Sequence, residues 1–98
     1  MTISSTFLND VLTIVLSGRL DSLTADDLDA YLAEHATAEV DRLVIDFAEV
    51  DYISSKGLRS LIKAYKMMNG RPIAIRNAGS AVTDVLKMSG LLKYFQTE

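Results

Sequence analysis

The sequence contains no cysteine and only one histidine, His35. The lack of cysteine excludes disulfide bonds, thiolate metal sites and cysteine nucleophiles. A single histidine cannot supply a multi-histidine metal site or a proton relay between two imidazole groups. We therefore predict neither a bound metal nor a cofactor.

The chain also lacks the sequence features of membrane-spanning proteins and of nucleic-acid-binding proteins. None of its apolar runs approaches the ~20 residues that a membrane-spanning helix needs, and no charged N-terminal region leads into an apolar block. Its formal net charge is −3, whereas a strong basic excess is typical of proteins that bind nucleic acid. We expect a soluble, cytoplasmic protein with no membrane or nucleic-acid partner.

Apolar residues, in contrast, are plentiful. They make up 49% of the 98 residues, which is enough for one hydrophobic core. No linker, repeat or low-complexity tract interrupts the chain. The sequence therefore predicts one domain that covers residues 1–98.

Four segments have the composition of β-strands: residues 3–8, 11–17, 41–47 and 72–76. The first two flank the turn-forming pair Asn9-Asp10, and Gly18 is predicted to end the second. The third is a nearly continuous apolar run, which is typical of a strand buried on both faces.

Three segments have the periodicity of helices: residues 23–35, a segment from the Ser54-Ser55 pair to residue 69, and a segment that begins at Ser80. Because helices alternate with strands after an initial hairpin, the expected fold is α/β. It consists of a mixed sheet of four or five strands with the helices packed against it.

Details of the helices can be predicted as well. Ser22 or Thr24 can cap the first helix, and Thr24 with Asp27 is similar to a capping box. Met68 and Met88 are expected to fill the core at their helical spacing. The apolar stripe of the second helix is predicted to be Leu58, Leu61, Ile62, Tyr65 and Met68.

The stretch DYISSKGLRSL, residues 51–61, places two hydroxyl groups where the second helix begins. A serine at this position can cap the free amide groups of the first helical turn. The same amides and the helix dipole favour an added phosphate. From these residues alone, Ser54 and Ser55 are either simple caps or a site of phosphorylation.

Four segments, in order and spread along the chain, resemble the STAS domain family of the bacterial anti-sigma factor antagonists. They are Gly18–Ser22, Val44–Phe47, Ile53–Arg59 and Met88–Phe95. The resemblance implies the fold expected above and a regulatory function. Antagonists of this family bind an anti-sigma factor that is also a serine kinase, which frees the sigma factor. The kinase then phosphorylates a serine at the helix start and ends the binding, and a phosphatase reverses the mark.

Carried onto this sequence, the resemblance indicates Ser55 as the phosphorylated residue, with Ser54 as the alternative. Many members of the family place the modified hydroxyl immediately before the glycine, but here Lys56 precedes Gly57. Ser55 is nearer to that position, and Ser54 is the residue better placed to cap the helix. The predicted partner-binding residues are Arg19, Asp21, Ser22, Ser54, Ser55, Lys56, Gly57, Arg59 and Lys63.

Other functions stay open. A STAS module that is never phosphorylated, acting as a scaffold in a stress-signalling or lipid-transport complex, would explain Lys56. An enzyme with Ser55 as nucleophile and Lys56 as its activator is disfavoured, because adjacent residues at a helix start point in different directions. We therefore predict no enzymatic activity. We expect a monomer or a weak dimer, since the edge of the hairpin can pair with another chain.

Overall fold

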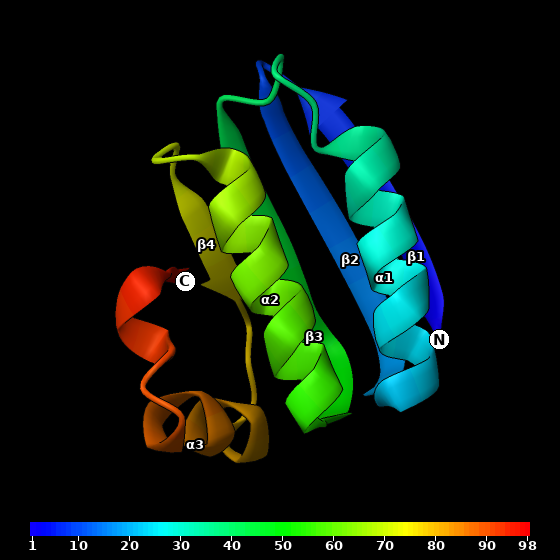
Figure 1. Ribbon diagram of the computed structural model, residues 1–98, viewed down its shortest axis with the longest axis vertical. Helices are drawn as coiled ribbons and strands as arrows, with labels where there is room; N and C mark the ends of the chain where they lie inside the picture. Colours follow the sequence, from blue (N-terminus) through cyan, green and yellow to red (C-terminus); the bar gives the residue numbers. More distant parts are fainter.

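The computed structural model describes residues 1–98, which form a five-stranded sheet and its helices (Figure 1). In chain order the elements are β1 (Thr2–Leu8), β2 (Val11–Leu20), α1 (Ser22–His35), β3 (Arg42–Ile53), α2 (Ser55–Met68), β4 (Ile73–Arg76), α3 (Ser80–Met88), the 3-10 turn η1 (Leu92–Tyr94) and β5 (Gln96–Thr97). None of the helices has the length and apolar character needed to cross a bilayer.

The sheet is mixed, as predicted from the sequence. Its strand order is β1-β2-β3-β4-β5; β1 pairs with β2 in antiparallel orientation, and all other neighbours are parallel. Asn9 and Asp10 form the hairpin turn with φ angles of 53° and 64°. Two left-handed residues in a row match the twist of a tight hairpin, and asparagine and aspartate tolerate that conformation well.

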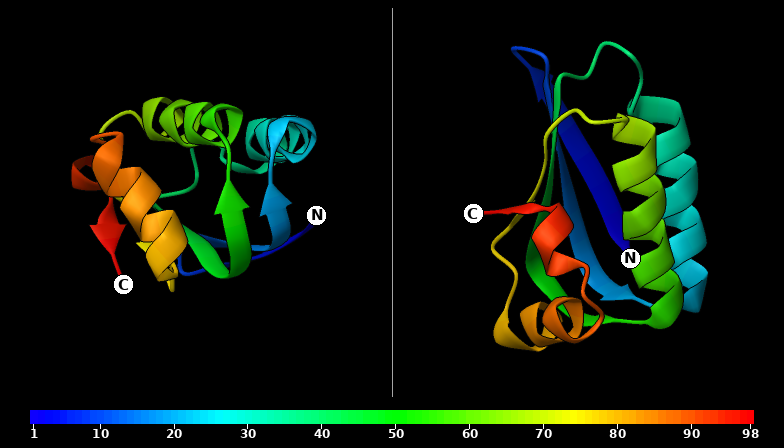
Figure 2. Two further views of the ribbon diagram at one scale, coloured as in Figure 1. Left: turned by 90° about the horizontal axis from the view of Figure 1, so that it is seen from below. Right: turned by 60° about the vertical axis from the view of Figure 1, so that its left-hand side comes forward.

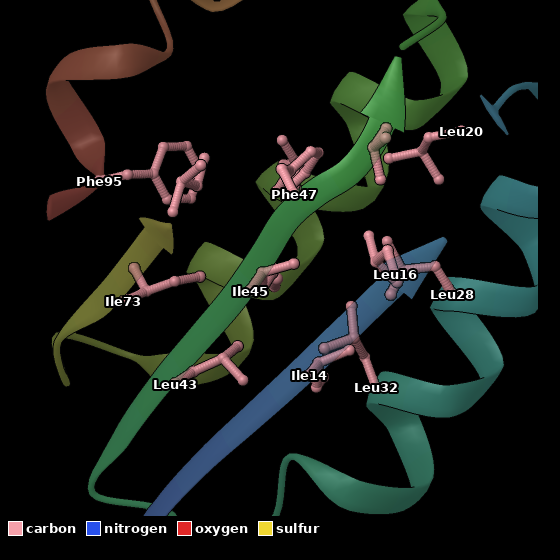
Figure 3. Packing of buried hydrophobic residues seen from close by; sticks show 14 of the residues in the cluster. Ile14, Leu16, Leu20, Leu28, Leu32, Leu43, Ile45, Phe47, Ile73 and Phe95 are labelled. Atoms are coloured by element: carbon pink, nitrogen blue, oxygen red, sulfur yellow. The ribbon is translucent and has the colours of Figure 1, made fainter. Parts of the chain in front are cut away.

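Helices α1 and α2 lie side by side on one face of the sheet, and α3 lies apart from them near the carboxyl-terminal end of β3 (Figure 2). The single core fills the space between this face and the two helices (Figure 3). Alternate residues of β2 point into it, because side chains alternate between the two faces of a strand. The largest fully buried side chains are Ile14, Leu16, Leu20, Leu28, Leu32, Leu43, Ile45, Phe47, Leu61, Met68, Ile75 and Leu86.

Two strands are longer than the sequence predicted. Strand β2 does not end at Gly18 but continues to Leu20, because Gly18 adopts a φ of 114° within the strand and the register with β3 shifts beside it. Strand β3 continues past residue 47 to Ile53. In its second half only Val50 and Ile53 are buried, each after two exposed residues, so this half lacks the continuous apolar run that marked the first half.

The cap of α1 also differs from the prediction. Asp21, rather than Ser22 or Thr24, is the N-cap residue, and it forms the capping box with Thr24, so Asp27 has no part in it. Oδ1 of Asp21 accepts a hydrogen bond from the N–H of Thr24 at 3.0 Å, and Oγ1 of Thr24 accepts one from the N–H of Asp21 at 2.8 Å. The cap lies at Asp21 because β2 extends to Leu20.

Two predicted core residues lie at the surface, although Met68 is buried as predicted. Met88 is 88% exposed, because it follows Val82 and Leu86, the residues through which α3 contacts the core. Tyr65 is 41% exposed, and its ring lies 5.3 Å from that of Tyr94. Tyr65 therefore lines an apolar hollow of about 340 Å³ between α2 and the C-terminal segment instead of filling the main core.

Candidate functional site

The ends of β2 and β3 bring two distant segments of the chain together. Leu20 is in register with Ile53, and the N–H of Ser54 donates a hydrogen bond to the carbonyl of Leu20 at 2.9 Å. The first turns of α1 and α2 therefore begin next to each other, at the lower end of Figure 1. Residues 19–22 and 54–59, which the sequence predicted to share a surface, lie at this one edge.

Ser54 and Ser55 have different roles in the structure. Ser54 is the N-cap of α2, with an extended φ of −91°, and its Oγ accepts the N–H of Gly57 at 3.1 Å. Ser55 is the first residue of the helix, and its side chain is exposed and makes no hydrogen bond. The predicted cap at Ser54 is thus confirmed, and the hydroxyl of Ser55 takes no part in it.

Replacing Ser54 by alanine should remove this cap. We expect Ser54→Ala to lower the free energy of unfolding by about 1 kcal/mol, because the N–H of Gly57 loses its acceptor. Urea unfolding followed by circular dichroism measures the change. Ser55→Ala is the matched control and should stay within about 0.5 kcal/mol of the wild type. Equal stability of the two variants would contradict the assignment of the cap.

Gly57 was predicted to bind a partner, but it lies beneath the surface. A Cβ atom at this position would stand 2.9 Å from both Cγ and the carbonyl oxygen of Leu20, and 3.0 Å from Cγ1 of Ile53. The absence of a side chain lets α2 start directly against the ends of β2 and β3. Gly57 therefore positions Ser55 and offers no side chain of its own to a partner.

Two ion pairs connect lysines of α2 to aspartates of α1. Nζ of Lys56 lies 2.8 Å from Oδ1 of Asp26, and Nζ of Lys63 lies 2.9 Å from Oδ2 of Asp29. Exposed pairs of this kind contribute at most ~1 kcal/mol each, so they orient the two lysines more than they stabilise the fold. Arg59 is exposed and takes part in neither pair, which leaves its charge available to a partner.

Asp21 and Ser22 occupy the start of α1, and Arg19 lies in β2 rather than in a loop. The guanidinium carbon of Arg19 lies 4.1 Å from the centre of the Tyr52 ring, and this ring is 41% exposed. Leu23, in the first turn of α1, is 80% exposed.

Tyr52 and Leu23 were missed by the sequence analysis. In the sequence, each of them is an apolar side chain that does not fit the periodic pattern of its strand or helix. Tyrosine, as at Tyr52, is a typical anchor of protein interfaces, whereas a single exposed leucine is common on protein surfaces.

The capping box also sets the protonation of Asp21. The N–H and the hydroxyl of Thr24 donate hydrogen bonds to the carboxylate, and the N–H of Leu23 and the charge of Arg19 add to their effect. Together they hold the pKa of Asp21 below its usual value, because hydrogen bonds to the charged form favour ionisation.

A lowered pKa in the folded state predicts a loss of stability in acid. The contribution of Asp21 is present above its unfolded pKa of ~3.9 and is lost as the pH falls through the lower folded value. Asp21→Asn retains a side-chain acceptor for the cap but cannot titrate. The fall in the urea midpoint between about pH 4 and pH 2 should therefore be smaller in Asp21→Asn than in the wild type. An identical fall in both proteins would exclude this role.

Comparison with known proteins finds similarity along nearly the whole chain. A sequence model of the STAS domain family matches residues 2–98. BtrV of Bordetella bronchiseptica, which is assigned as an anti-sigma factor antagonist, is 31% identical over 91 residues, covering 90% of this chain and 78% of BtrV.

Solved structures show the same similarity. An anti-sigma factor antagonist from Mycobacterium paratuberculosis is 25% identical and has a TM-score of 0.88, covering 98% of this chain and 83% of its own. The antagonist SpoIIAA of Bacillus, in its unphosphorylated form, is 16% identical with a TM-score of 0.85, covering 99% of this chain and 88% of its own. At that identity SpoIIAA shares the fold alone.

Proposed function

This chain belongs to the STAS domain family and resembles its anti-sigma factor antagonists, and we propose that it binds an anti-sigma factor that is also a serine kinase. The binding surface is the edge where α1 and α2 begin. Arg19, Ser22 and Arg59 supply polar contacts there, and the exposed side chains of Leu23 and Tyr52 supply apolar anchors. Such a complex acts in the cytoplasm, where sigma factors engage RNA polymerase.

The observation that carries the proposal is the difference between the two adjacent serines. The oxygen of Ser54 is committed to the N–H of Gly57, whereas the hydroxyl of Ser55 is exposed and unbonded. A kinase docked on this edge reaches Ser55 without opening the helix. The N-terminal amides and the helix dipole of α2 then stabilise the phosphate in place.

Phosphorylation of Ser55 ends the binding. A phosphate adds about −1.5 to −2 charges and three strongly hydrated oxygens to the centre of the surface. The partner must desolvate that charge or lose contact. A phosphatase restores the free hydroxyl, so the chain is a substrate in this cycle and needs no catalytic residue of its own.

The test uses an anti-sigma factor serine kinase from the organism that makes this protein, and a gene for such a kinase beside the gene of this chain would be the first candidate. Incubation with this kinase and ATP should add one phosphate to the wild type, as measured by intact mass, and none to Ser55→Ala. Ser54→Ala should still be modified. Phosphorylation of Ser55→Ala to the wild-type extent would place the site elsewhere, and loss of modification only in Ser54→Ala would place it at Ser54.

A second candidate function is favoured by Lys56, which no serine kinase can modify and which Asp26 holds in place. In this case the chain is an unphosphorylated scaffold in a larger signalling or lipid-transport complex. Protein purified from its native host distinguishes the two functions. A stoichiometric complex that forms with or without ATP, and whose intact mass shows no phosphate, favours the scaffold.

A further inference from the structure

Strand β1 is an exposed edge of the sheet. It lies at the end of the strand order, and its register with β2 runs without a bulge from Thr2 to Leu8. Natural edge strands are usually protected by charge, proline, a bulge or short length. Strand β1 has seven residues, TISSTFL, and none of these protections.

The opposite edge of the sheet is protected. Strand β5 has only two residues, and Glu98 follows it directly. The carboxylate of Glu98 pairs with the guanidinium groups of Arg42 and Arg76. Charge and short length therefore protect this edge, and the contrast makes β1 the edge that is open to another strand.

The hairpin determines which groups of β1 face outward. A two-residue turn closes on a hydrogen-bonded pair, here Leu8 with Val11, and hydrogen-bonded pairs recur at every second residue. The even-numbered residues of β1 therefore bond to β2. The N–H and C=O groups of Ile3, Ser5 and Phe7 point away from the sheet and have no strand to pair with.

These outward groups are arranged symmetrically about Ser5. In an antiparallel pair of two β1 strands centred on Ser5, Ile3 of one copy lies opposite Phe7 of the other, and Ser4 lies opposite Thr6. Apolar side chains then meet apolar ones, and hydroxyls meet hydroxyls. Every outward N–H and C=O of the three odd-numbered residues finds its partner, as a two-fold interface requires.

The surface beside Phe7 can receive the second copy. Phe7 is 51% exposed and borders a hollow of about 320 Å³ between the hairpin and the end of α1. Leu12 and Val40 contribute apolar lining to this hollow. In the symmetric pair the Ile3 side chain of the other copy arrives next to Phe7, at the mouth of the hollow.

We propose that β1 pairs with β1 of a second copy of this chain, centred on Ser5, to form a symmetric dimer with one continuous sheet. The Ser55 edges of the two copies lie at opposite ends of this dimer, because the β1 strands are antiparallel and that edge lies beyond the start of β1 (Figure 1). Both edges remain open to partners. The dimer therefore presents two binding edges that face in opposite directions, whatever the state of Ser55.

One structural feature limits the affinity. The hydroxyl of Tyr31 lies 2.5 Å from Oγ of Ser5, so the face of α1 that carries Tyr31 is directed toward β1. Asp27 and Glu34 fall on this face at helical spacing and are exposed. In the dimer Asp27 of each copy faces Glu34 of the other, and like charges disfavour close association. The pairing is thus a weak one that strengthens as salt screens the repulsion.

Sedimentation equilibrium from about 10 µM to 1 mM tests the proposal with two matched pairs of variants. Ser5→Pro removes an outward N–H, whereas Ser5→Ala keeps it; both lose the hydrogen bond to Tyr31. Phe7→Lys adds a charge at the edge, whereas Met88→Lys adds the same charge at an exposed residue of α3. We expect Ser5→Pro and Phe7→Lys each to raise the dissociation constant at least about tenfold and the two controls to leave it unchanged.

Amide hydrogen exchange supplies a second measurement that does not depend on a variant. Exchange at Ile3, Ser5 and Phe7 should slow as the protein concentration rises. A wild type that remains monomeric at about 1 mM would overturn the proposal. So would a dimer that survives both Ser5→Pro and Phe7→Lys, or one whose concentration-dependent protection lies around the hollow between α2 and the C-terminal segment.

Discussion

Gly57→Ala is expected to lower the free energy of unfolding by about 2 kcal/mol, although alanine is the better helix former. The new Cβ would stand 2.9 Å from the carbonyl oxygen of Leu20 and 3.0 Å from Cγ1 of Ile53. The oxygen belongs to the backbone of β2, so it cannot rotate away as the end of a flexible side chain can. The start of α2 must shift outward, and the packing of its first turn against both strands is lost.

The matched control is Gly79→Ala. No atom lies within 4 Å of a Cβ built at Gly79, and its φ of −70° suits any residue. Gly79 is the N-cap residue of α3, a position where glycine is preferred to alanine, so Gly79→Ala should lower the free energy of unfolding by no more than about 1 kcal/mol. Urea unfolding of both variants under the same conditions makes the comparison. If Gly57→Ala proved as stable as Gly79→Ala, the close contact between α2 and β2 would be wrong.

The order of the helices and strands could be predicted from the sequence because the alternating pattern of the strands and the helical periodicity of the helices are both strong. Alternate residues of β2 point to one buried face, and Leu61 and Met68 of the predicted stripe of α2 are buried. The ends of β2 and β3 could not be predicted in the same way. Beyond Gly18, and beyond Phe47, exposed residues interrupt the apolar pattern, and the pairing of β2 with β3 keeps both strands extended.

Some features of the candidate site could likewise be predicted from the sequence, and others could not. The cap at Ser54 follows from local chemistry, and the sequence predicted it. At the start of α1, Asp21, Ser22 and Thr24 are all competent caps, and the end of β2 decides among them. The ion pair of Lys56 with Asp26 joins two helices, so the periodicity of either helix alone could not reveal it.

A phosphate on Ser55 should weaken binding to the cognate anti-sigma factor kinase by about 100-fold, or ~2.7 kcal/mol, while the fold remains intact. Binding is expected to weaken because the phosphate lies at the edge where α1 and α2 begin, and a partner that docks there must remove water from it. The fold is expected to tolerate the phosphate because the free N–H groups of the first helical turn and the dipole of α2 favour an anion at that position. The free energy of unfolding should therefore change by less than about 1 kcal/mol.

Lys56 determines how much of the phosphate charge on Ser55 is neutralised before a partner binds. Its ammonium pairs with Asp26 in the unmodified chain, and a phosphate one residue away competes for it. In Lys56→Gln the phosphate keeps its full charge, so phosphorylation should reduce binding by more than in the wild type. Ser55→Asp carries one charge and fewer oxygens, so it should reproduce only part of the loss.

Isothermal titration of the kinase with phosphorylated and unphosphorylated chain, each in the wild type and in Lys56→Gln, gives the four affinities required. A phosphorylated chain that binds as tightly as the unmodified one would remove Ser55 as the residue that controls binding. Equal losses in the wild type and in Lys56→Gln would leave the control at Ser55 in place. They would show that Lys56 stays paired with Asp26 after Ser55 is phosphorylated.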